Sequence, residues 1–240
     1  AGSNTVSILL NTATHSTTVF TEQTPVAVSS SIIINDLDGD GSWDGGSLSV
    51  QVSSNASLAD SLSLASTTGI WLDTDGNKLM VGYTAIGTAD AASVAGDATW
   101  HFTFNGNATN DLVQQVARAI TFNNSSDAPS LLDRTITFTV ADNLGATALV
   151  DQTVDVTPVN DAPTGTVTIS GVLLPGERLT ALNTIADPDG LGTIHYQWRA
   201  DGVAINGATG ESYLLSQSDA GKEITVVALS LIHISQGIVR

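Results

Sequence analysis

Alternation of apolar and polar residues, repeated along the chain between turn-forming residues, most restricts what this sequence can fold into. In residues 135–140, Thr-Ile-Thr-Phe-Thr-Val, every second residue is apolar. Successive side chains of a β-strand point to opposite faces, so Ile136, Phe138 and Val140 are predicted to face a core. Alternating or β-branched runs recur at residues 4–10, 25–35, 47–52, 77–85, 99–104, 148–157, 165–170, 177–182, 193–199, 210–215 and 223–229. The pattern predicts an all-β fold.

One segment has helical periodicity instead. Leu112, Val116 and Ile120 recur at four-residue spacing, and Asn110 or Asp111 can cap the helix start. We therefore expect one short helix at about 111–120. A hairpin turn is also predicted at residues 73–76, Asp-Thr-Asp-Gly, between two strand runs.

Two modules are predicted, because 240 residues are enough for about two domains of ordinary size. Prolines interrupt the pattern in residues 157–163, Thr-Pro-Val-Asn-Asp-Ala-Pro, which indicates an extended linker. The expected organisation is a β-sandwich at 1–157, a linker at 158–163 and an incomplete β-sandwich with Trp198 in its core at 164–228. Residues 229–240 carry neither the acids nor the turn residues found before them, and we interpret them as a non-native tail.

The charge balance excludes several classes of function. With 24 acidic residues against 7 Lys and Arg, the net charge is −17, which argues against nucleic-acid and anionic-membrane binding. No apolar run is long enough to span a membrane. The absence of Cys excludes thiolate nucleophiles and zinc–thiolate sites. No enzyme is predicted, because His15, His101, His195 and His233 are scattered and no known nucleophile or metalloprotease motif is present.

Residues 36–44, Asp-Leu-Asp-Gly-Asp-Gly-Ser-Trp-Asp, have the spacing of a calcium loop. Alternate carboxylates packed this closely repel by about 1 to 4 kcal/mol per pair at ~4 Å, which a divalent cation would relieve. Gly41 would permit the sharp turn, but Ser47 stands where an EF-hand needs Glu, so the loop is predicted in a β setting. The alternative is an acid-rich surface turn. The predicted ligands are the carboxylates of Asp36, Asp38, Asp40 and Asp44 and the backbone carbonyl of Ser42.

A second group of carboxylate and amide side chains is dispersed along the sequence. Each member alone is readily explained as an acid at a turn or a strand end, but together they could converge at the junction of the two modules and hold a second calcium ion. The group consists of Glu22, Asp142, Asn160, Asp161, Asp187 and Asp189.

Two resemblances follow from these motifs. About residues 4–163 resemble the cadherin-like repeats of large bacterial secreted proteins, and about residues 165–228 resemble a bacterial immunoglobulin-like repeat. The first resemblance is carried by residues 20–25, 36–44, 110–122, 123–129, 134–140 and 156–163, and the second by residues 186–190, 196–198, 201–207 and 218–226.

The resemblances imply tandem calcium-binding repeats in a large extracellular adhesin-type protein, where they act as a rigid spacer in cell adhesion or biofilm formation. The implied partners are Ca²⁺, neighbouring repeats of the same chain and a cell-surface protein or glycan. The alternative is a carbohydrate- or protein-recognition module attached to a secreted hydrolase. In that case a partly exposed Trp43 or Trp71 would stack on a sugar, although packing in the core or at its rim explains both residues better.

Overall fold

The computed structural model describes residues 5–10, 17–37, 39–65, 69–73 and 78–230. The chain separates into two compact units, Ala1–Val159 (unit 1) and Asn160–Arg240 (unit 2). The described residues are mostly β-strand, as the alternation predicts, with a single α-helix among them.

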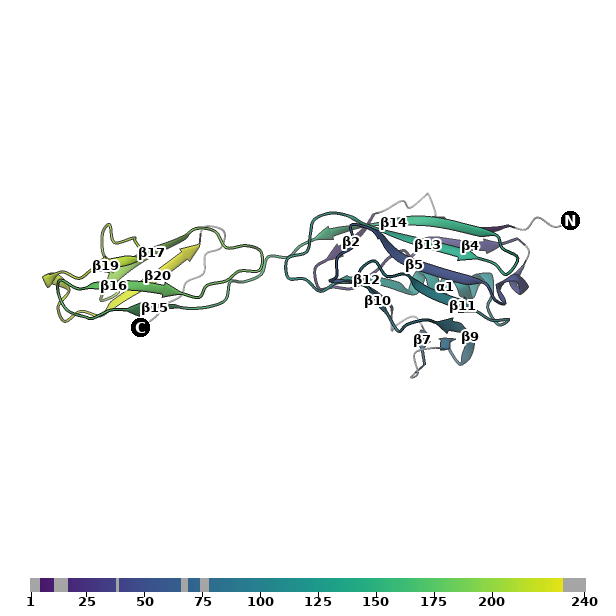
Figure 1. The fold of residues 1–240 in the computed structure, drawn as a ribbon, viewed down its shortest axis with the longest axis horizontal. Coiled ribbons are helices and arrows are strands. Elements are labelled where there is room, and N and C mark those ends of the chain that lie inside the picture. The colour runs from purple at the N-terminus through teal and green to yellow at the C-terminus, as the bar shows by residue number, and fades with distance from the viewer. Residues whose placement is uncertain (1–4, 11–16, 38, 66–68, 74–77, 231–240) are drawn as a thin grey trace. The chain divides into compact units, whose positions relative to one another are not determined.

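An eight-stranded sheet forms the larger layer of unit 1 (Figure 1). Its strands are antiparallel, except that β2 runs parallel to the end of β14, where Thr21 pairs with Thr157. In sheet order they are β2 (Thr18–Thr21), β14 (Thr147–Thr157), β13 (Arg134–Ala141), β5 (Ser47–Ser54), β11 (Trp100–Phe104), β9 (Thr84–Ala89), β8 (Lys78–Val81) and β7 (Ile70–Leu72).

The rest of unit 1 consists of a smaller sheet, a strand pair and the helix. The smaller sheet has the order β10 (Val94–Ala95), β6 (Asp60–Leu64), β12 (Ile120–Asn124) and β3 (Val26–Ala27). The pair is β1 (Val6–Leu10) with β4 (Ile32–Asp36), and helix α1 (Asn110–Ala119) packs against β4. A short 3₁₀ helix, η2 (Asp40–Trp43), follows β4.

One continuous apolar core fills unit 1. In β13 the burial alternates along the strand as predicted, with Ile136, Phe138 and Val140 fully buried. Phe20 and Phe122 meet edge to face across the core at 5.1 Å between ring centroids. Such pairs contribute about 0.5–1.5 kcal/mol beyond their buried area.

Three details of unit 1 differ from the sequence-based expectation. The run at 25–35 is broken into β3 and β4, which pair with different strands. The run at 77–85 is not one strand: it contributes to both β8 and β9, and the chain turns between these two strands at Gly82, which has φ +58°. The helix is capped by neither Asn110 nor Asp111: the side chain of Thr109 accepts a hydrogen bond from the Leu112 amide. The predicted hairpin forms between β7 and β8, although turn residues 74–76 lie outside the described part of the chain.

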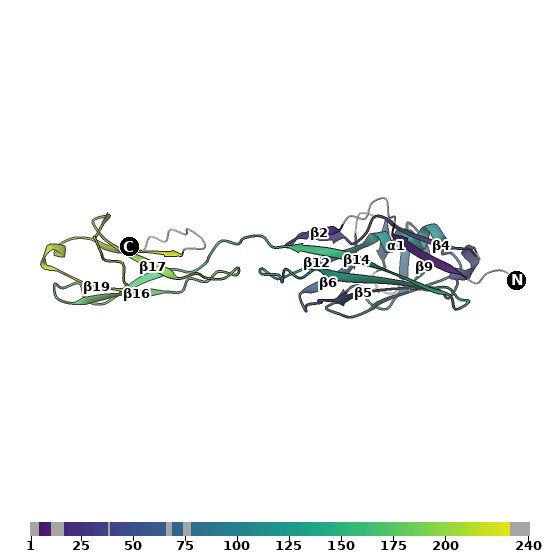
Figure 2. The same cartoon turned by 90° about the horizontal axis from the view of Figure 1, so that it is seen from above.

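Unit 2 is a sandwich of two three-stranded sheets (Figure 2). Trp198 is fully buried between them, as predicted, and stacks on Tyr213 with ring centroids 5.8 Å apart. The strands are β15 (Val167–Ser170), β16 (Arg178–Asn183) and β19 (Ser212–Leu214) in one sheet, and β18 (Val203–Ala204), β17 (Ile194–Ala200) and β20 (Ile224–Ser230) in the other.

The predicted linker residues are held by the two units. The Val159 amide donates to the Glu22 carboxylate in unit 1, and the Asp161 amide donates to the Asp189 carboxylate in unit 2. At the other end, Leu229 and Ser230 still belong to β20 and pair with His195 and Ile194. The remainder of the predicted non-native tail, residues 231–240, lies outside the described residues.

A buried carboxylate closes the turn before β20. Asp219 accepts hydrogen bonds from the Ser216 hydroxyl, the Ser216 amide and the Tyr213 hydroxyl, at 2.6–2.8 Å. The bond from the Ser216 side chain is the largest cause that lowers the pKa of Asp219. Burial, together with the bond to Asp219, raises the pKa of Tyr213.

We expect Asp219→Asn to destabilise unit 2 at neutral pH. Because the pKa of Asp219 is lower in the folded chain, its contribution is complete above the unfolded-state pKa and is lost as pH falls through the folded-state pKa. The difference between the variant and the parent chain should therefore vanish in acid. Hydrogen exchange of β17 and β20 across acid pH measures it, with exposed Glu211→Gln as control. A difference that persisted unchanged in acid would contradict this assignment.

Candidate metal-binding sites

The Asp36–Asp44 segment is anchored to helix α1 by one amide side chain. Asn110 Oδ1 accepts from the Asp36 amide at 2.9 Å and from Trp43 Nε1 at 2.9 Å, while Asn110 Nδ2 donates to the Asp36 carbonyl at 3.2 Å. Trp43 is fully buried and lies edge to face with Phe104. The segment is therefore folded over an apolar anchor at the start of the helix.

The predicted ligands of this segment have different surroundings. Asp36 ends β4 and is buried, whereas Asp44 is exposed and its carbonyl accepts from Asn143 Nδ2 at 3.0 Å. Asp38 lies outside the described residues. Asp40 and Ser42 are placed in η2, and the structure describes only their backbone.

The sharp turns of this segment do not use the expected glycine. Gly39 has φ +95° and Gly45 has φ +91°, whereas Gly41 lies within η2 and has no positive φ. The adjoining Gly46 packs tightly, because a Cβ there would lie 2.9 Å from the Ala141 carbonyl oxygen and 3.2 Å from the Trp43 ring. The sharp turn predicted at Gly41 is therefore made at Gly39 and Gly45 instead.

A pair of carboxylates lies at the opposite end of unit 1, where the chain leaves it. Glu22 directly follows β2 and is only 5 % exposed, and its carboxylate accepts the Val159 amide at 2.8 Å. A carboxylate oxygen of exposed Asp127 lies within 4.8 Å of one of Glu22. Among the described residues, neither carboxylate forms an ion pair with a basic side chain. At this separation the two charges repel by about 1 to 3 kcal/mol, which a cation would offset.

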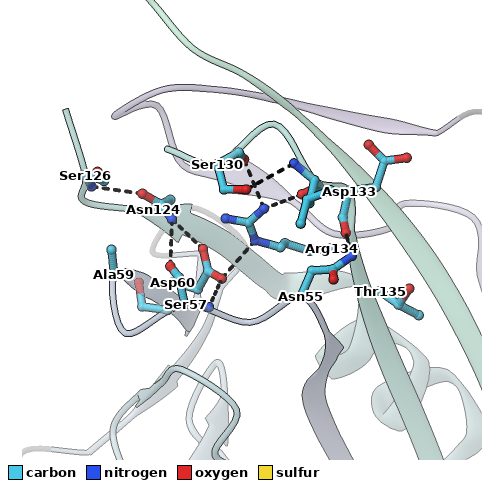
Figure 3. A network of polar contacts seen from close by, with 12 residues as sticks. Asn55, Ser57, Ala59, Asp60, Asn124, Ser126, Ser130, Asp133, Arg134 and Thr135 are labelled. Carbon is cyan, nitrogen blue, oxygen red and sulfur yellow. Dashed lines mark hydrogen bonds and ion pairs between the residues drawn. The ribbon is translucent and has the colours of Figure 1, made fainter. Parts of the chain in front are cut away.

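Asp127 belongs to a loop that is tied to the interior of unit 1 (Figure 3). Arg134, at the start of β13, and Asp60, at the start of β6, are both fully buried and form an ion pair at 3.0 Å. The Arg134 guanidinium also donates to the Ser130 and Leu132 carbonyls. Asn124, where the loop begins, donates to Asp60 at 2.5 Å. Both ends of residues 124–134 are thus fixed to one buried carboxylate.

The structure does not bring Asp142 to Glu22. The Asp142 carboxylate accepts the Leu144 and Ala146 amides and closes the turn between β13 and β14. Glu22 instead bonds through its amide to Thr157, at the far end of the eleven-residue strand β14. At about 3.3 Å per residue the two ends of β14 are ~33 Å apart. Asp142 is next to Asn143, which contacts Asp44, and therefore lies at the end of unit 1 that carries the Asp36–Asp44 segment.

The remaining predicted acids meet within unit 2. The Asp189 carboxylate accepts the Asp161 amide at 2.6 Å, and the Asp187 carboxylate accepts the Asp189 amide at 3.0 Å. Asn160 is exposed and donates to the Asp161 carbonyl. Two segments separated by more than twenty residues are thus joined through the carboxylate of Asp189.

The structure also shows the surroundings of the histidine and tryptophan side chains that were considered for catalysis or sugar binding. His101 is exposed on β11 and bonds to the Ser49 hydroxyl, as expected for the outward face of a strand. Trp43 cannot stack on a sugar because it is buried, whereas Trp71 is 43 % exposed on the edge strand β7. The helix in the described part of the chain is too short to cross a membrane.

Comparison with models of known protein families gives no match to this chain, and comparison with curated proteins gives none either. The cadherin-like and immunoglobulin-like resemblances therefore rest on the sequence motifs alone.

Proposed function

We propose that this chain is a calcium-binding structural region of a large extracellular bacterial repeat protein and acts as a calcium-rigidified spacer in cell adhesion or biofilm formation. The observation that carries the proposal is the unneutralised pair of Glu22 and Asp127 where the chain leaves unit 1. Oxygen ligands of this kind suit Ca²⁺, which takes six to eight of them in flexible geometry. The proposed role is structural, with no catalytic step.

Further acids follow this pair where the chain continues into unit 2. Glu22 already contacts Val159, the last residue of unit 1, and Asn160 and Asp161 follow it directly in the chain. Asp161 is bonded to Asp189, whose amide is bonded to Asp187. Calcium bound by Glu22 and Asp127, here called the junction site, would hold the end of unit 1, where Val159 is bonded to Glu22. The proposed ligand set therefore includes Asp127 and no longer includes Asp142.

The Asp36–Asp44 segment is proposed as a second, independent site. Its position on β4 and η2, held to α1 by Asn110, gives the loop a fixed base. Asp142 and Asn143 lie beside Asp44, so this end of unit 1 is also rich in oxygen ligands.

We expect calcium to raise the unfolding free energy of the full chain and to bind with a dissociation constant near 10⁻⁴–10⁻³ M, as is usual in extracellular modules. At roughly 1 mM calcium, a site at the tighter end contributes about 1.4 kcal/mol. Glu22→Gln with Asp127→Asn should remove the contribution of the junction site, because both amides keep the shape but not the charge. Asp38→Asn with Asp40→Asn should separately remove that of the loop.

Thermal unfolding with calcium and with EDTA, together with calorimetric titration, measures both contributions. Asp151→Asn with Asp155→Asn is the matched control, since these two exposed carboxylates on β14 change the net charge by the same two units and should leave calcium binding unchanged. A parent chain whose melting temperature is the same in calcium and in EDTA would overturn the proposal.

A further inference from the structure

The sequence contains two Asn–Gly pairs, and unit 2 holds one of them in an open turn. Asn206 and Gly207 are both exposed between β18 and β19, and the Ala208 amide closes the turn onto the Ile205 carbonyl at 3.1 Å. Gly207 has φ +75°, a conformation that glycine adopts without strain. No bulky side chain of residue 207 therefore screens the amide nitrogen that follows Asn206.

Two groups of this pair form no hydrogen bond in the described part of the chain. The Asn206 side-chain amide and the Gly207 N–H have no hydrogen-bond partner there. The peptide between the two residues can therefore rotate without breaking a hydrogen bond. The neighbouring residues are held, since the Ile205 and Ala208 carbonyls both accept from Gln197 Nε2.

The other pair, Asn105–Gly106 in unit 1, has the same sequence in a different environment. Asn105 is half-buried, its Oδ1 accepts the Asn107 amide at 2.9 Å, and its Nδ2 donates to the Ala85 carbonyl at 3.1 Å. Both ends of this side-chain amide are thus in use. The chain contains its own protected control.

From this contrast we propose that Asn206 is a site of spontaneous deamidation, a covalent modification independent of calcium binding. The deprotonated Gly207 amide nitrogen attacks Asn206 Cγ, the new C–N bond closes a five-membered succinimide, and the Cγ–Nδ2 bond breaks to release ammonia. Water from the solvent then adds to either carbonyl of the ring. One product is an ordinary aspartate at this position; the other is isoaspartate, in which the backbone runs through the former side chain.

The products alter the turn beside the core of unit 2. Either one adds a negative charge to a chain that already has a net charge of −17. Isoaspartate also lengthens the backbone between Ile205 and Ala208. These two residues exchange hydrogen bonds with the backbone of buried Trp198, at 2.9 and 3.0 Å, so the modification acts on the strand that carries the core tryptophan.

Ageing the full chain in mildly alkaline buffer, followed by tryptic mapping and tandem mass spectrometry, tests the proposal. Cleavage after Arg199 and Lys222 isolates Asn206, and cleavage after Lys78 and Arg118 isolates Asn105. In the folded chain Asn206 should convert about tenfold faster or more, because Asn105 must first lose two hydrogen bonds. In denaturant the two pairs should convert at similar rates.

Asn206→Gln should abolish the conversion in its peptide, since the longer side chain cannot close a five-membered ring, while Asn105 is unaffected. Equal rates at Asn105 and Asn206 in the folded chain would overturn the proposal. So would an Asn206 peptide that stays intact in the folded chain but reacts once the chain is unfolded.

Discussion

Replacing Arg134 with Met should lower the unfolding free energy of unit 1 by about 3–5 kcal/mol, because it leaves the charge of Asp60 buried without its partner. The substitution also removes the donor that holds the Ser130 and Leu132 carbonyls. The loop bearing Asp127 should therefore loosen, and calcium affinity at the proposed junction site should fall as well. Hydrogen exchange of β13 and β5 in the full chain measures the first effect, and calorimetric titration the second.

A double variant separates the charge from the packing. Asp60→Asn combined with Arg134→Met removes both charges, and the loss should be smaller than the sum of the two single losses because no charge remains buried. A loss below about 1 kcal/mol for Arg134→Met alone, the range of exposed ion pairs, would contradict this role for the buried pair.

The alternating pattern predicted strands best where one face of the strand is buried and the other exposed. Residues 134–141 meet this condition, and burial alternates along the whole of β13. Strand β12 was missed because Ile120 continues the helical spacing of Leu112 and Val116, and only tertiary pairing with β6 ends the helix there. The break within 25–35 falls at three successive serines, and the pairing of each half depends on strands far away in the sequence.

The candidate sites show the same division between local and distant information. The link between Asp161 and the turn of Asp187 and Asp189 agrees with the sequence analysis, which places these three acids in one group. The pairing of Glu22 with Asp127 could not be anticipated, since more than one hundred residues separate them and the approach depends on a loop fixed by Arg134. The polar run at residues 123–127, Asn-Asn-Ser-Ser-Asp, was the available signal. Asp142 was misplaced because alternation identifies the end of a strand without saying which end of the sheet it occupies.

Trp43→Ala should be the most damaging change near the Asp36–Asp44 segment, with an expected loss of about 3–5 kcal/mol in the stability of unit 1. The side chain is fully buried against Phe104, and Gly46, which packs on its ring, has no side chain that could fill the cavity. Its indole N–H also shares Asn110 Oδ1 with the Asp36 amide. Trp43→Ala should therefore destabilise the core and also reduce the stabilisation by calcium that depends on Asp38 and Asp40.

Two further tryptophan variants make the test specific. Trp43→Phe keeps an aromatic ring but no N–H donor, so its loss should be smaller, and it reports the contribution of the bond to Asn110. Trp71→Ala removes an indole of the same size from the half-exposed edge strand β7 and should cost much less than Trp43→Ala. Chemical denaturation of each full-length variant, in calcium and in EDTA, measures both effects. If Trp43→Ala were no more destabilising than Trp71→Ala, the segment could not be anchored through Trp43, and its fixed base would have to come from Asn110 and the β1–β4 pair alone.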